Sequence, residues 1–112
     1  MESEWYELKA QVIKAMGHPS RLKMIDAVAR QELCVNDLQK IVGSDLSTVS
    51  KHLSVLKNAG IVRDRKVGLM VYYSLRVPTI MEFFGCVESV MRARFAAVAI
   101  GPGIDPLAAS GQ

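Results

Sequence analysis

The chain has 112 residues with a formal net charge of +3, and half of its residues are hydrophobic. This length predicts one domain, and because charged or polar residues interrupt every apolar run, a membrane-spanning helix is excluded. The first ten residues hold three glutamates and no basic leader before an apolar stretch, so we expect no secretory signal and a cytoplasmic protein. Two cysteines, Cys34 and Cys86, are too few for a disulfide scaffold and are expected to be free thiols.

Two amphipathic helices are predicted in the first thirty residues. Apolar side chains recur at helical spacing over residues 4–15, and Pro19 suits the first position of a second helix. The next segment, from Leu33 to Val35, is apolar and expected to be extended. Asn36 and Gln39 have the spacing of a capping box, which predicts that Asn36 caps a short third helix ending at Gly43.

A fourth helix is predicted after a short turn, with Asp45 as its N-cap and Gly60 at its C-terminal end. Two helices joined by a short glycine-containing turn form a helix-turn-helix. Residues 61–75 are rich in β-branched and aromatic residues around Gly68, which predicts a hairpin, or wing. We therefore expect a mainly α fold with a small β-hairpin, a winged helix-turn-helix.

A last amphipathic helix opens after Pro78 and presents a broad apolar face. The residues after it are rich in glycine and proline. We expect residues 1–98 to form one winged helix-turn-helix domain, and residues 99–112 to form a flexible tail.

Positive charge is concentrated in residues 47–76, which hold six lysines and arginines against one aspartate, a net +5. This indicates a polyanionic partner. On the fourth helix the face opposite Val49 is short, polar and basic, as a helix in the major groove requires, although a solvated helix face has the same composition. The candidate DNA-binding residues are Ser47, Thr48, Ser50, Lys51, His52, Ser54, Lys57, Arg63, Arg65, Lys66 and Tyr72.

The motifs HPSRL, VSKHL and LKNAGIV, together with the paired tyrosines of the hairpin, closely resemble the ArsR/SmtB family of winged-helix repressors, in particular its arsenical-responsive branch. The resemblance covers roughly residues 5–95. It implies a homodimer that binds an imperfect palindrome in double-stranded DNA and is released by an effector, with no cofactor required for binding. It also implies dimerisation through the first and last helices, whose apolar residues are Trp5, Leu8, Val12, Ile80, Phe83, Phe84, Val87, Val90 and Met91.

The resemblance also directs attention to the thiols. Family members that sense arsenicals carry a second cysteine two residues after the position of Cys34, where this chain has Asn36. Cys86 on the last helix is the remaining thiol, and the pair would suit a trivalent arsenic or antimony species. Two alternatives stay open: the cysteines are small buried hydrophobes, or they form a redox or persulfide switch. The last helix has no histidine, which argues against a zinc site there.

Two other classes of function compete with a repressor. A winged helix can serve as a protein-interaction module without specific DNA, but the charge of residues 47–76 favours DNA. The sequence has no nucleophile–base pair, glycine-rich phosphate loop or acidic dyad, so we do not expect an enzyme.

Overall fold

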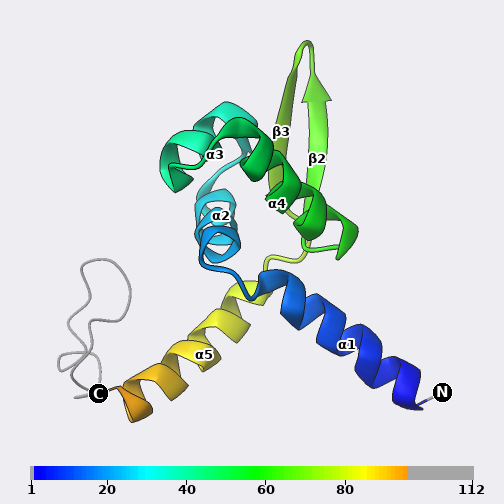
Figure 1. Ribbon diagram of the computed structural model, residues 1–112, viewed down its shortest axis with the longest axis vertical. Helices are drawn as coiled ribbons and strands as arrows, with labels where there is room; N and C mark the ends of the chain where they lie inside the picture. The colour runs from blue at the N-terminus through cyan, green and yellow to red at the C-terminus, as the bar shows by residue number, and fades with distance from the viewer. Residues whose placement is uncertain (1, 96–112) are drawn as a thin grey trace. The chain divides into compact units, whose positions relative to one another are not determined.

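The computed structural model describes residues 2–95 and divides the chain into two units, one up to Pro78 and one from Thr79 onward, each of which is described by itself (Figure 1). The tail predicted for residues 99–112 lies outside the described residues. No helix among residues 2–95 has the length and apolar character needed to cross a bilayer.

Four helices form most of the first unit: α1 (Glu2–Met16), α2 (Pro19–Arg30), α3 (Val35–Val42) and α4 (Leu46–Asn58). Local capping explains their boundaries. The His18 ring nitrogen Nδ1 accepts a 3.1 Å hydrogen bond from the Ser20 amide, with Pro19 directly at the start of α2. Asp45 caps α4 as predicted, because its carboxylate accepts a 2.8 Å hydrogen bond from the Thr48 amide. Gly43 ends α3 with φ +83°, a conformation that glycine adopts without strain.

The start of α3 differs from the prediction, because the N-cap is Cys34 and not Asn36. Asp37, three residues on, accepts a 3.2 Å hydrogen bond from the Cys34 amide and another of 3.2 Å from its thiol. Asn36 lies inside the helix and is exposed. Strand pairing holds Cys34 in the extended conformation that an N-cap requires, and Asp37 completes the capping box, so the helix begins at Val35.

The predicted hairpin is confirmed and belongs to a three-stranded antiparallel sheet of order β1-β3-β2. Its strands are β1 (Leu33–Cys34), β2 (Val62–Val67) and β3 (Met70–Leu75). Val67 pairs with Met70 across a two-residue turn in which Gly68 has φ +62°. Glycine at the first position of such a turn is typical of type II′, which suits the twist of a hairpin.

A single hydrophobic core joins α2, α3, α4 and the base of the sheet. Helical periodicity directs one face of α4 inward, and the same core receives the first residue of β2 and the last of β3. Its most deeply buried side chains are Met24, Ile25, Leu38, Val49, Leu53, Leu56, Ile61 and Val62. The core therefore fixes the helix-turn-helix and the base of the wing as one body.

The first helix leaves much of its apolar surface uncovered. Trp5 is 61% exposed, Leu8 57% and Val12 38%. The second unit contains α5 (Ile80–Arg94), on which Phe83, Val87 and Val90 are exposed. Of the other predicted interface residues, Ile80 and Met91 are half-buried and Phe84 is buried.

Candidate nucleic-acid interface

The outward face of α4 carries a compact polar and basic surface. Because Val49, Leu53 and Leu56 point into the core, the opposite side of the helix faces solvent. Four of the predicted DNA-binding residues are exposed there: Ser47, Ser50, Lys51 and Ser54. Three short hydroxyl side chains around one lysine allow the helix backbone to come close to a groove.

The N-terminus of this helix is ordered by its cap. Ser47 donates a 3.1 Å hydrogen bond to the Asp45 carboxylate, which also accepts the Thr48 amide. The hydrogen bond from the Thr48 amide is the main cause that lowers the pKa of Asp45. Thr48 itself is half-buried. Because its amide completes the cap, its backbone has a structural role in addition to any contact of its side chain with DNA.

Two predicted DNA-binding cations are already paired with carboxylates. Arg65 donates two hydrogen bonds, of 2.6 Å and 3.2 Å, to Glu32, which directly precedes β1. Lys57 at the end of α4 lies 2.9 Å from Asp64 on β2. These hydrogen bonds lower the pKa of both carboxyl groups and raise that of Lys57. A DNA phosphate would have to displace Glu32 from Arg65 or Asp64 from Lys57. Arg63 and Lys66, in contrast, are exposed on β2.

Sequence reasoning did not find these pairs. Glu32 and Arg65 are 33 residues apart, and only the folding of β1 onto the sheet brings them together. Tyr72 is half-buried, and it is the central member of a row across the sheet in which Cys34 and Arg65 are its neighbours. The thiol and the wing are thus joined through one strand.

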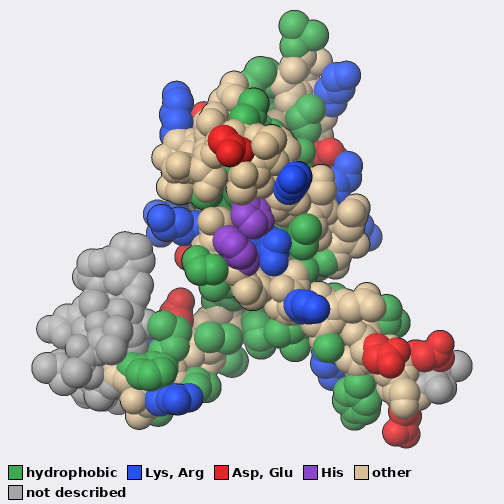
Figure 2. Space-filling model, viewed as in Figure 1, with side chains coloured by type: hydrophobic (Ala, Val, Ile, Leu, Met, Phe, Trp, Pro, Cys, Tyr) green, Lys and Arg blue, Asp and Glu red, His purple; other side chains and the backbone are tan. Residues whose placement is uncertain are grey.

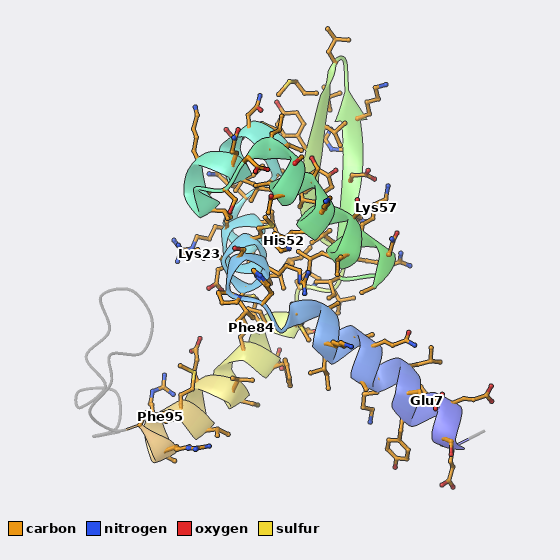
Figure 3. All side chains as sticks on the ribbon, viewed as in Figure 1. Glu7, Lys23, His52, Lys57, Phe84 and Phe95 are labelled. Atoms are coloured by element: carbon orange, nitrogen blue, oxygen red, sulfur yellow. The ribbon has the colours of Figure 1, made fainter. Side chains whose placement is uncertain are left out.

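His52, labelled in Figure 3, contacts two side chains that the sequence did not predict for the site, Arg21 on α2 and His18 at the N-cap of α2. Its Nδ1 is 3.2 Å from a guanidinium nitrogen of Arg21, and its ring centroid is 4.5 Å from that of His18. The paired histidines are visible as one purple cluster in Figure 2. A contact between His52 and DNA stays a prediction.

Both histidines of this cluster use the ring nitrogen Nδ1 in their contacts. Arginine can only donate, so His52 must accept at an unprotonated Nδ1, and His18 must likewise accept the Ser20 amide at Nδ1. Burial is the main cause that lowers the pKa of His52, followed by the charges of His18 and Arg21. The HPSRL motif held the sequence signal for this cluster, because it contains His18 and Arg21.

The two cysteines have different environments. Cys34 is buried, and its thiol donates to Asp37, whereas Cys86 on α5 is exposed. They lie in different units of the chain. Within residues 2–95, no three or more His, Cys, Asp and Glu side chains form a group able to hold a metal ion.

Comparisons with known proteins identify the type of regulator. The family described as "Bacterial regulatory protein, arsR family" matches residues 18–64, which include the helix-turn-helix. An uncharacterized HTH-type transcriptional regulator of Mycobacterium tuberculosis H37Rv is 34% identical over 93 residues, which cover 81% of this chain and 82% of that protein. A transcriptional repressor SmtB homolog of Synechocystis is 41% identical over 75 residues, or 67% of this chain and 57% of that protein.

Solved structures agree in fold. NolR from Sinorhizobium fredii has a TM-score of 0.74 at 30% identity, covering 80% of this chain and 89% of that one. The homodimeric winged helix-turn-helix DNA-binding domain of a possible ArsR-family regulator from Mycobacterium bovis has a TM-score of 0.75 at 26% identity, covering 90% and 94%. With the match of sequence, fold and exposed α4 face, the chain belongs to the ArsR family of bacterial regulatory proteins, which are DNA-binding transcriptional regulators and not enzymes.

Proposed function

We propose that this protein is a sequence-specific transcriptional repressor that binds an imperfect DNA palindrome as a homodimer and is released by a thiol-reactive effector. The observation that carries the proposal is the exposed face of α4, with Ser47, Ser50, Lys51 and Ser54 beside a cationic hairpin in the same unit. In the major groove, Lys51 would contact a guanine edge or a phosphate, and the hydroxyls would contact bases or backbone. Arg63 and Lys66 would add affinity through phosphates.

Dimerisation is supported by the exposed apolar side chains of α1, and of α5 considered by itself. Trp5, Leu8 and Val12 form an exposed apolar surface on α1, and such a surface is typical of a protein–protein interface. The M. bovis domain with the same fold is homodimeric. In a two-fold dimer the half-sites would lie about 34 Å apart, one turn of DNA.

For the effector, we favour a trivalent arsenic or antimony species bound by Cys34 and Cys86. Among the relatives, a cadmium resistance regulatory protein CadC homolog of Staphylococcus aureus is 45% identical over 67 residues, covering 59% of this chain and 55% of that protein. The surroundings of Cys34 support a route to the wing. A soft ion on its sulfur would remove the thiol hydrogen bond to Asp37, and Cys34 pairs with Tyr72, which pairs with Arg65.

A redox or persulfide switch at the same cysteines is the second candidate. This switch would use the same two groups as the arsenical site, the buried thiol of Cys34 and the exposed thiol of Cys86. It differs in the effector, because polysulfide or peroxide would release DNA without any metal ion.

The repressor proposal is tested by measuring binding of the protein to the DNA upstream of its own gene (the chain's own upstream DNA), by fluorescence anisotropy over a series of salt concentrations. A specific repressor prefers this DNA to a shuffled sequence by about a thousandfold or more. Equal affinity for both DNAs at every salt concentration would contradict the proposal and leave the protein-interaction module as the better reading.

The effector is tested by release of bound DNA with arsenite, antimonite, cadmium and polysulfide. Cys34→Ser and Cys86→Ser should each abolish release by arsenite while leaving DNA affinity intact. Release by polysulfide alone would favour the redox switch. Release that survives loss of both thiols would contradict either form of thiol sensor.

A further inference from the structure

The tip of the wing is apolar and fully open to solvent. Leu69, at the turn, is 98% exposed, the highest value among the large exposed hydrophobic side chains of the described residues. Its neighbours Val67 and Met70 are 46% and 38% exposed. A β-turn in water is normally polar, so an apolar residue at this position gains nothing in the free protein.

The distal half of the hairpin has no support from the rest of the sheet. β1 pairs with β3 only at Tyr72 and Tyr73, so the segment from Lys66 to Val71 is a two-stranded ribbon beyond the third strand (Figure 1). Figure 2 shows green side chains at the end of this ribbon and a blue cationic side chain just below them. The apolar tip is thus held away from the core that could have buried it.

Charge identifies the partner for this tip. The ribbon from Lys66 to Val71 carries Lys66 and no carboxylate, and Arg63 is exposed nearer the base of β2, so the hairpin is cationic toward its apolar end. The strand that leads to the tip, β2, packs against α4 in the same unit. A cationic ribbon with an apolar end fits DNA, where phosphates line a groove and base steps expose apolar stacking surfaces.

We infer that Leu69 is a wedge that enters the minor groove of the operator and partly unstacks one base step, bending the DNA. The inference rests on the proposed function, since it requires operator binding. Leucine and methionine are among the residues that insert between base steps in this way. Pyrimidine–purine steps unstack most easily, so the base step under the wing would contribute to specificity without any hydrogen bond.

The test compares wild type with Leu69→Ala and Leu69→Lys on the chain's own operator, with affinity and the bend angle measured by fluorescence energy transfer between the DNA ends. The wedge predicts that Leu69→Ala weakens binding about tenfold or more. It also predicts that both variants lose the bend, because neither side chain replaces the stacking surface. The matched control is Ile41→Ala, an apolar position on α3 that is 45% exposed and lies outside the hairpin, which should keep the bend.

Other results would overturn the wedge. An unchanged affinity of Leu69→Ala, or an unchanged bend in either Leu69 variant, would show that the tip does not enter the DNA. Binding of wild type to anionic vesicles that Leu69→Ala abolishes, with operator binding intact, would assign the tip to a lipid surface. Failure of the wild type to bind operator at all would contradict the proposed function itself. Since Leu69 is exposed, unchanged thermal unfolding of the free variants excludes a folding defect.

Discussion

The burial of Leu53 allows a quantitative prediction for the stability of helix α4. Leu53 is 1% exposed and packs into the core from α4, whereas Val55, two residues on, is 38% exposed. Leu53→Ala removes the Cγ and both Cδ carbons of a buried side chain and leaves a cavity, which costs about 2–5 kcal/mol of unfolding free energy. Val55→Ala loses a small exposed surface and should cost under about 1 kcal/mol.

Urea denaturation followed by circular dichroism measures this difference. With an m value of about 1.5 kcal/mol/M, Leu53→Ala should lower the midpoint by about 1–3 M and Val55→Ala by well under 1 M. All variants must be compared at one protomer concentration, because the proposed dimer would couple stability to concentration. Equal midpoint shifts for the two variants would refute the assignment of Leu53 to the inward face of α4.

Three further predictions concern the cap, the cluster and the wing. Gly43→Ala should lower the unfolding free energy by about 1–2 kcal/mol, because alanine is strained at φ +83° although its Cβ meets no atom. Gly43→Asn should lower the unfolding free energy less, and equal losses for the two variants would contradict this reasoning. The unfolding free energy should fall as the pH drops below about 6.5 and through the lowered pKa of His52, because the unfolded chain takes up the proton first. Urea titrations over this pH range should show a shallower fall of the unfolding free energy for His52→Gln than for wild type. Glu32→Gln should tighten DNA binding a few-fold at low salt, because it frees Arg65 from its carboxylate partner, and the gain in affinity should vanish at high salt. If anisotropy titrations show no gain in affinity, Arg65 does not contact the phosphates.

Local signals predicted most of the fold. Gly43, Asp45, Gly60 and Gly68 each act within a few residues, and each marks the boundary or turn expected from the sequence. The N-cap of α3 was mispredicted because Asn36 is a stronger cap than cysteine by intrinsic preference. A tertiary contact, the pairing of Cys34 with Tyr72, overrides that preference.

The exposure of one face of α4 was predictable from the sequence, whereas the pairing of the charged side chains around it was not. The outward face of α4 follows from helical periodicity, because burial of Val49 fixes which side is exposed. In contrast, the bonds of Arg65 with Glu32 and of His52 with Arg21 join residues about 30 positions apart. Composition gives the charge of such residues, while only the fold shows which of those charges are already paired.

The most direct test of the account is the effect of Lys51→Ala on binding to the chain's own upstream DNA, compared with Lys40→Ala. Lys51 is exposed on the outward face of α4, whereas Lys40 is an exposed lysine in the last turn of α3. The account predicts that Lys51→Ala loses about 1–3 kcal/mol of specific binding, most of it absent on shuffled DNA, and that Lys40→Ala loses much less. Equal losses for the two lysines, or no loss for Lys51→Ala, would contradict recognition of operator DNA by α4.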